Sequence, residues 1–184
     1  LNKFKMIRCR CCNENTDKRI FSSKIFQKEV DYFECKNCEY VFTEKPTWLN
    51  EAYSSSINDS DTGIMIRNLS NASLVLATLT LIKDRKSSIV DYAGGHGFLV
   101  RLLRDIGIDA LWLDPYSKNL VAKGFEFKNK HNANLVTAFE CFEHFEYPIK
   151  DMAKLLNIAP NILLSTSIIP KPTPNPLDWW YYGL

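Results

Sequence analysis

The sequence predicts an α/β fold, a doubly wound parallel sheet that follows a small cysteine-rich module. From residue 88 onward, short apolar runs alternate with amphipathic helical patterns, which indicates parallel strands joined by crossover helices. A glycine-rich loop follows the first of these runs, and two Cys-x2-Cys pairs lie near the N-terminus. At 184 residues and 46% hydrophobic content, the chain can bury one ordinary core with a small appendage.

We expect three segments along the chain: a zinc ribbon at 1–45, a connecting segment with a packing helix at 46–86, and the α/β core at 87–184 with a proline-rich and aromatic tail. Five strand patterns of a core fit before Leu184. The apolar stretch 74–82 is about half of what a bilayer crossing needs, and no signal peptide is evident. We therefore expect a soluble, cytoplasmic protein.

The first motif is the pair Cys9-x2-Cys12 and its repeat Cys35-x2-Cys38. A two-residue gap lets a tight turn direct both thiolates at one ion, and two such turns supply the four sulfurs of a closed, structural Zn²⁺ site. Cys11 lies beside the first pair, but Cys9 with Cys12 reproduces the spacing of the second pair. The alternative is a set of reduced cysteines without metal.

Strands and one long helix are expected before the core. The strand patterns within the ribbon are 19–26, 30–35 and 40–44. A polar, turn-rich stretch follows, with Ser60 or Asp61 as the N-cap of a helix. The residues predicted to form the packed face of this helix are Met65, Leu69, Ala72, Leu76 and Leu79.

The core is predicted from its alternating pattern. The strand runs are 88–92, 110–114, 135–139 and 161–169. One helix, with an apolar face at Leu99, Leu102, Leu103 and Ile106, is closed by Gly107, and a second begins at Pro148 and ends at Pro160. Between them, "FEF" at 125–127 offers at best a short third strand, in which Phe125 and Phe127 either shape an adenine slot or, as we favour, pack in the core.

The loop "DYAGGHG" carries an acid followed by small residues at alternate positions, Asp91, Ala93, Gly95 and Gly97. Glycines let the backbone approach a cofactor closely, and the helix that starts near Gly97 offers unpaired N–H groups. A dinucleotide fingerprint that begins at Gly95 needs glycine at position 100, which is Val100. This mismatch weakens the reading as an NAD-dependent oxidoreductase, which we keep as an alternative.

The loop resembles motif I of the class I S-adenosylmethionine-dependent methyltransferases, with Ala93 where that family normally has glycine. The cysteine ribbon, the stretch "FTEKPTWLNEAYSSSINDSDTG", the loop, "FECFEHF" and "WWYY" follow in the order of a bacterial group of these enzymes with an N-terminal zinc ribbon. The resemblance covers nearly the whole chain. It implies a Rossmann-like methyltransferase sheet, S-adenosylmethionine as cofactor and a structural zinc ion. Cores of this family usually carry seven strands, so the resemblance also implies that the sheet is incomplete at Leu184 and continues in residues beyond it.

The resemblance also implies site residues. Those implied for the cofactor are Asp91, Ala93, Gly94, Gly95, Gly97, Asp114, Pro115, Phe139 and Glu140, with Asp114 on the ribose. Glu140, Glu143 and His144 match the segment that faces the acceptor, and they are the predicted catalytic residues. If a helical turn begins near Cys141, Glu140 and His144 share one face and can act as acid and base. Alternatively, His144 fixes the turn through a backbone hydrogen bond.

The predicted function is methyl transfer to a small-molecule acceptor, with a sugar or related metabolite as a family-level expectation. A third reading is a non-enzymatic zinc-ribbon module on a degenerate core, binding nucleic acid through Lys18, Arg19 and Lys24. The net charge of +2 disfavours nucleic acid, no membrane partner is expected, and the oligomeric state stays open. The aromatic residues 179–182 either wall an acceptor site or, as we favour, cover the sheet edge of the core.

Overall fold

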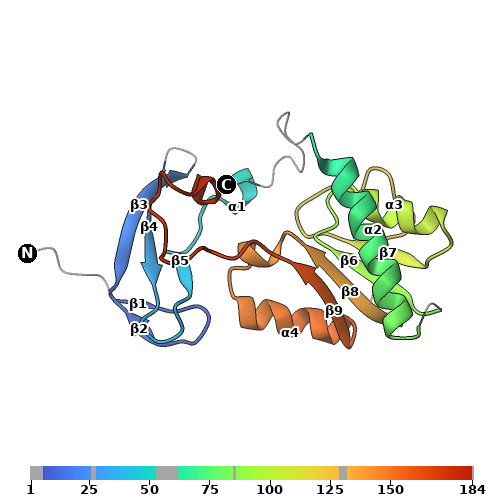
Figure 1. Cartoon of the computed structure of the whole chain (residues 1–184), viewed down its shortest axis with the longest axis horizontal. Helices are drawn as coiled ribbons and strands as arrows, with labels where there is room; N and C mark the ends of the chain where they lie inside the picture. Colours follow the sequence, from blue (N-terminus) through green and yellow to red (C-terminus); the bar gives the residue numbers. More distant parts are fainter. Residues whose placement is uncertain (1–5, 26–27, 53–61, 85, 129–131, 184) are drawn as a thin grey trace, which may run out of the picture. The chain divides into compact units, whose positions relative to one another are not determined.

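A computed structural model describes residues 6–25, 28–52, 62–84, 86–128 and 132–183 (Figure 1). The chain separates into two compact units. The first, here called the ribbon unit, consists of Leu1–Ala52, Glu146–Ile149 and Ser167–Leu184. The second, the sheet unit, consists of Tyr53–Phe145 and Lys150–Thr166.

The sheet unit is built on four parallel strands in the order β7-β6-β8-β9. Their bounds are Ser88–Tyr92 for β6, Ala110–Leu113 for β7, Ala133–Phe139 for β8 and Asn161–Ser165 for β9. This arrangement confirms the α/β, Rossmann-like class predicted from the alternating runs. The chain passes from β6 to one neighbour, β7, and then returns to the other side at β8. Ligands of such sheets bind beyond the carboxyl ends of the strands at this reversal.

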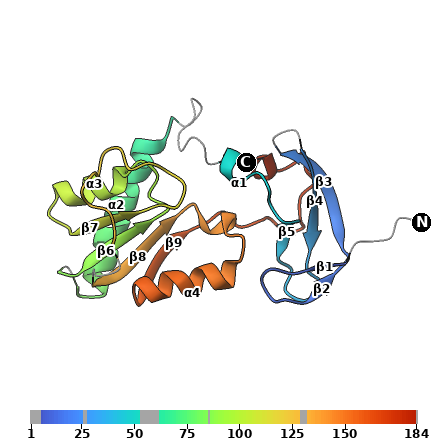
Figure 2. The same cartoon turned by 180° about the vertical axis from the view of Figure 1, so that it is seen from behind.

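Helices cover both faces of the sheet (Figures 1 and 2). On one face lie α2, Ile64–Leu81, and α3, Phe98–Asp105, and on the other lies α4, Pro148–Ile158. Successive strand residues point to opposite faces, so Ile89 packs in the cluster with α2 and α3, whereas Val90 packs in the cluster with α4. The predicted proline start at Pro148 is confirmed.

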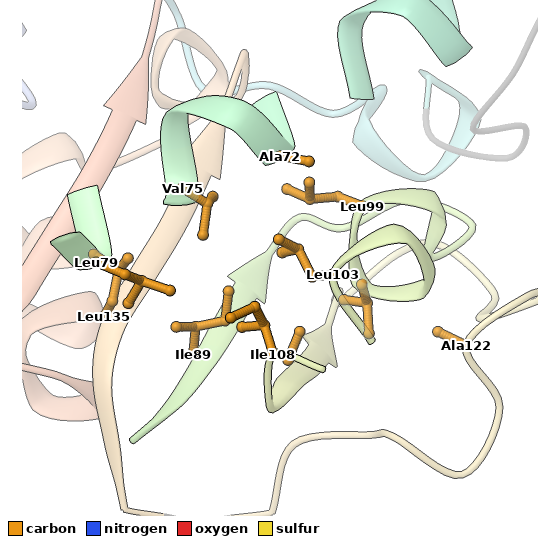
Figure 3. Packing of buried hydrophobic residues seen from close by; sticks show 11 residues of the cluster. Ala72, Val75, Leu79, Ile89, Leu99, Leu103, Ile108, Ala122 and Leu135 are labelled. Carbon is orange, nitrogen blue, oxygen red and sulfur yellow. The ribbon is translucent and has the colours of Figure 1, made fainter. Parts of the chain in front are cut away.

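Helix α2 contributes Ala72, Val75 and Leu79 to the first cluster, where they face strand and α3 side chains (Figure 3). The predicted face of this helix is wrong in its first turns: Met65 is 47% and Leu69 50% exposed. The buried stripe runs through positions 72, 75 and 79, while Met65, Ile66 and Leu69 in the first two turns are exposed. The predicted N-caps, Ser60 and Asp61, lie outside the described residues, and the helix begins after Gly63.

Among the described residues, α2 is the one helix whose length and composition would allow it to cross a membrane. At 18 residues it is longer than the apolar stretch considered from the sequence alone. Three of its side chains lie in the protein core, and a single such helix is weak evidence for a span. We treat it as a core helix.

The predicted third strand is reduced to one bridge between Trp112 and Glu126 beside β7. The N–H of Trp112 donates to the carbonyl of Phe125, and the N–H of Phe127 donates to the carbonyl of Trp112, each over 2.8 Å. Phe125 packs in the cluster on one face and Phe127 in the cluster on the other. The two rings are thus core residues, as favoured from the sequence.

The ribbon unit contains two small antiparallel sheets. One pairs β1, Ile7–Arg8, with β2, Asn15–Thr16, and the other orders β3, Arg19–Ile25, β4, Lys28–Glu34, and β5, Val41–Thr43. The short helices are α1, Leu49–Ala52, and the 3₁₀ helix η2, Trp180–Gly183. The three longer strands follow the predicted patterns, whereas β1 and β2 were not predicted.

The aromatic tail packs on the ribbon rather than on the sheet edge of the core, where the sequence led us to expect it. Tyr182 is buried, its ring lies 4.7 Å from that of Phe21, and the hydroxyl of Tyr32 donates to its carbonyl over 2.8 Å. Trp179 packs against the same cluster. The strands β3 and β4 carry aromatic side chains of their own, and these supply the partner surface for the tail.

Candidate functional site

The glycine loop leaves the carboxyl end of β6 with three residues in the left-handed region: Ala93 at φ 56°, Gly95 at φ 54° and Gly97 at φ 93°. A Cβ added at Gly95 would meet no atom within 4 Å, so this side of the loop is open among the described residues. Gly97 precedes the first residue of α3 as its N-cap. The loop therefore presents bare backbone and a helix N-terminus at the reversal point of the sheet.

Gly94 has a different reason to be glycine. A Cβ there would lie 2.8 Å from Oδ2 of Asp91 and 3.0 Å from Cδ1 of Trp112. Real Cβ atoms do not approach other atoms this closely, so the loop passes between the two side chains only because position 94 has none. Trp112 was not predicted as a site residue, because its role depends on the pairing of β7 with β6.

Hydrogen bonds to backbone carbonyls of the loop link it to β7 and to the segment that follows β7. Nε1 of Trp112 donates to the carbonyl of Gly95 over 2.9 Å. The carbonyl of His96 accepts from the N–H groups of Leu120 and Val121, each over 3.1 Å. The ring of His96 adds a contact between Nδ1 and the carbonyl of Lys118, at 3.1 Å. The imidazole of His96 is thus engaged by the protein itself.

Asp114 lies at the end of β7 and contacts the loop. Its Oδ2 accepts from the N–H of Gly95 over 2.9 Å, and its Oδ1 accepts from the N–H groups of Tyr116 and Ser117 over 2.8 Å each. A carboxylate has about four acceptor positions, so these bonds leave some capacity for a ligand hydroxyl. Pro115, beside it, is exposed.

Asp91 is the buried acid of the site, with 4% of its surface exposed. The hydroxyl of Thr137 donates to its Oδ1 over 2.6 Å. Burial raises the pKa of Asp91 to about 7, a rise that the Thr137 hydrogen bond opposes and the negative charge of Asp114 reinforces. Thr137 was missed from the sequence, although a polar residue inside the apolar run "NLVTAF" was the available signal.

The acid-rich turn begins directly after Phe139, the last residue of β8. Glu140 adopts φ 48°, and its Oε1 accepts from the hydroxyl of Ser165 over 2.6 Å. Oε2 of Glu143 accepts from the hydroxyl of Thr166 over 2.8 Å. The end of β9 thereby holds both carboxylates in place, a role for Ser165 and Thr166 that the sequence analysis did not foresee.

The turn itself is a 3₁₀ helix, η1, over Phe142–His144. Glu140 lies before it in the left-handed region, so the α-helical face expected to align Glu140 with His144 is not formed. His144 is an exposed residue, yet desolvation by surrounding protein lowers the pKa of its imidazole, an effect that Glu143 and Glu140 partly offset. Cys141 is buried, and this burial raises the pKa of its thiol to about 12, as for a small buried hydrophobe.

In the ribbon unit, the ligand atoms of Cys9, Cys12, Cys35 and Cys38 all lie within 4.8 Å of one another. The sulfur atoms of Cys9 and Cys38 are 3.7 Å apart, and those of Cys12 and Cys35 are 3.5 Å apart. Four thiolates at about 2.3 Å from a tetrahedral ion would be about 3.8 Å apart, so the arrangement fits one metal ion. Cys11 is not part of this group.

Both cysteine turns have the same backbone geometry. The N–H of Asn13 donates to the carbonyl of Cys9 over 3.0 Å, and the N–H of Glu39 donates to that of Cys35 over 2.9 Å. Asn13 has φ 66° and Glu39 φ 58°, the left-handed conformation that asparagine tolerates better than glutamate. The two turns therefore act as matched halves of one site.

Two of the basic residues considered for nucleic-acid binding pair with acids. Lys18 lies 2.9 Å from Glu34, and Arg19 lies 3.0 Å from Asp31. Such exposed pairs contribute little to stability, but they neutralise two of the three cations on which a nucleic-acid surface was considered.

The chain was also compared with families of known proteins. A family model described as "Methyltransferase domain" matches residues 65–184, which include the glycine loop, Asp114 and the acid-rich turn and leave the cysteine group outside. No curated protein matches the chain.

Proposed function

This chain belongs to the methyltransferase-domain family, and from that membership we propose that it is a class I enzyme that transfers a methyl group from S-adenosylmethionine to a small molecule. The observation that carries the proposal is the open side of Gly95, in the loop between Asp91 near the end of β6 and Asp114 just after β7, at the reversal point of the sheet. A cofactor with a positively charged sulfur and an ammonium group suits such an acidic strand edge.

The residues present fit this cofactor. We assign its methionine end to Asp91 and the backbone of the glycine loop, and its ribose hydroxyls to Asp114, with Pro115, Phe139 and Glu140 along the same strand ends. Bound S-adenosylmethionine supplies an electrophilic methyl carbon on a sulfonium sulfur. The chain holds the acceptor against that carbon and excludes water, which is where most of the rate enhancement of such a transfer arises.

We assign proton transfer to residues of the acid-rich turn. Bound S-adenosylmethionine would supply the methyl group, and an acceptor hydroxyl or amine would lose a proton when it is methylated. His144 accepts this proton, since its lowered pKa keeps the imidazole neutral near pH 7. Glu143 and Glu140, held by Thr166 and Ser165, then stabilise the imidazolium.

We further propose that the four cysteines bind one structural Zn²⁺ ion, supported by the fit of their sulfur separations to a tetrahedral site. The division into a zinc ribbon at 1–45, a connecting segment at 46–86 and a methyltransferase core at 87–184 is part of this proposal. So are a cytoplasmic location and a small-molecule acceptor such as a sugar.

Isothermal titration with S-adenosylhomocysteine tests the proposed function. We expect the wild-type chain to bind and Asp114→Ala to lose at least about tenfold in affinity, because charged hydrogen-bond partners contribute about 1.5–3 kcal/mol. Asp109→Ala is the matched control, since Asp109 precedes the same strand at its opposite end. Absence of binding to the wild type, or an equal loss in both variants, would refute the assignment.

A further inference from the structure

Thr137 is a polar residue in the interior of a central strand. It pairs in register with Asp91 of β6, and its exposed fraction is 0%. A buried hydroxyl without a partner is costly, and this one donates to Oδ1 of Asp91 over 2.6 Å. The bond therefore joins two side chains buried in the middle of the sheet.

The same hydrogen bond fixes the orientation of the Asp91 carboxyl group. With Oδ1 held by Thr137, Oδ2 lies against the glycine loop, 2.8 Å from the point where a Cβ at Gly94 would be. Residues 91 and 137 lie on the same sheet face as Ile89 and Leu135, which pack with α2 and α3. The orientation of the carboxyl group is thus fixed from the core side and presented to the loop.

We propose that Thr137 is a positioning residue of the cofactor site: its hydroxyl fixes the Asp91 carboxylate in the orientation and ionised form that receive the ammonium group of S-adenosylmethionine. The inference rests on the proposed function for its ligand, whereas the link between Thr137 and Asp91 rests on the geometry of the two side chains alone.

The surroundings of Asp91 explain why this bond matters. Desolvation is the largest influence on the pKa of Asp91 and raises it, and Asp114 at the end of β7 raises it further. Cys141, after β8, also interacts electrostatically with Asp91, but its own raised pKa keeps the thiol neutral. Thr137 is the group found to act in the opposite direction, by donating to the charged form. Loss of its hydroxyl therefore favours the protonated acid.

The experiment titrates the Asp91 carboxyl carbon by ¹³C NMR in the cofactor-free full chain, with Asp91→Asn to assign the signal. Thr137→Val removes the hydroxyl and keeps the β-branched shape, and we expect it to raise the midpoint by about one pH unit. Thr137→Ser keeps the hydroxyl and should leave the midpoint near that of the wild type. Thr16→Val is the matched control, since Thr16 is another buried threonine, 1% exposed, whose hydroxyl donates to the backbone carbonyl of Glu34 in the ribbon unit.

Calorimetry with S-adenosylhomocysteine on the same proteins adds the functional part. Thr137→Val should weaken binding at pH 7 by about tenfold and Thr137→Ser by less than about twofold, because the lost bond is made to a charged group. Raising the pH should restore part of the affinity of Thr137→Val, which a mere packing defect would not do. If Thr137→Val does not fold, Thr137→Ala takes its place.

The proposed function and the inference about Thr137 can be refuted separately. A wild-type chain that shows no S-adenosylhomocysteine binding refutes the proposed function, while the carboxyl titration still measures the Thr137–Asp91 link. A wild-type chain that binds, with an unchanged Asp91 midpoint in Thr137→Val, overturns the inference about Thr137. So does an equal shift in Thr137→Ser, since the hydroxyl would then not be the cause.

Discussion

The indole N–H of Trp112 donates to the carbonyl oxygen of Gly95 over 2.9 Å, across the gap between β7 and the loop that follows β6. Two residues further along the chain, the Asp114 carboxylate accepts from the N–H of the same glycine. Both backbone groups of Gly95 are therefore held by side chains of the neighbouring strand. The loop has its shape before a ligand arrives, which reduces the ordering cost of binding.

Trp112→Phe tests this arrangement by removing one N–H group from a ring of similar shape. Loss of a neutral hydrogen bond of about 0.5–1.5 kcal/mol should weaken S-adenosylhomocysteine binding by roughly twofold to tenfold. Hydrogen exchange should also become faster at the amides of the loop. Trp48→Phe in the ribbon unit is the control, and a similar loss there would show that the effect is not specific to the loop.

Ala93→Gly should stabilise the protein, because Ala93 holds φ 56°. Release of left-handed strain, about 1–2 kcal/mol, exceeds the extra chain entropy of glycine, about 0.5–1 kcal/mol, so we expect a net gain of about 0.5–1 kcal/mol. Urea unfolding measures it. Ala77→Gly, at an exposed position inside α2, should lose about 1 kcal/mol in the same assay, and loss in both variants would contradict the strain at position 93.

Asp91→Asn should stabilise the fold in a pH-dependent way. The pKa of Asp91 in the folded chain is about 7, against an ordinary value of about 4, so the folded state binds more protons than the unfolded state between these values. Wild-type stability from this group is consequently lost as the pH rises from about 4 to about 7. Asparagine does not titrate, so we expect the unfolding free energy of Asp91→Asn to exceed that of the wild type by about 2–4 kcal/mol at pH 8.

Unfolding of wild type and Asp91→Asn at pH 5 and pH 8 checks this expectation. The difference in unfolding free energy between the two proteins should be much larger at pH 8. An equal difference at both pH values would mean that Asp91 titrates near its ordinary pKa in the folded chain.

Cys12→Ser and Cys11→Ser form a matched pair for the metal site. Only Cys12 belongs to the four-sulfur group, so its loss should release the zinc ion and unfold the ribbon, which is too small to be stable on its core alone. Cys11→Ser should keep one zinc ion per chain. Metal content by atomic emission and the circular dichroism spectrum decide the matter, and equal zinc loss in both variants would show that Cys11 is also a ligand.

Local patterns predicted the elements of the sheet well. The expected run 88–92 is β6, Ser88–Tyr92, because a short, largely apolar run directly before a glycine loop leaves little choice of boundary. The tight turns at Cys9–Cys12 and Cys35–Cys38 were likewise predicted from the cysteine spacing alone. These features depend on residues close together in sequence.

Features that depend on distant partners were not predicted. The partners of Asp91 and Gly95, Thr137 and Trp112, become visible only once the register of β8 and β7 against β6 is known. The packed face of α2 was predicted wrongly at Met65 and Leu69. Hydrophobic periodicity predicts which side of a helix faces the core, but not how far along the helix other elements cover that side. The position of Tyr182 on the ribbon depends on contacts across most of the chain.

That last contact has a consequence for synthesis in the cell. Tyr32 and Tyr182 are 150 positions apart, so the ribosome adds the tail of the ribbon unit long after its strands. At about 5–20 residues per second, the aromatic face around Tyr32 stays uncovered for roughly 10–30 s. During that interval the nascent strands expose an apolar surface to chaperones, and the ribbon reaches its final packing only after strands β6 to β9 have been synthesised.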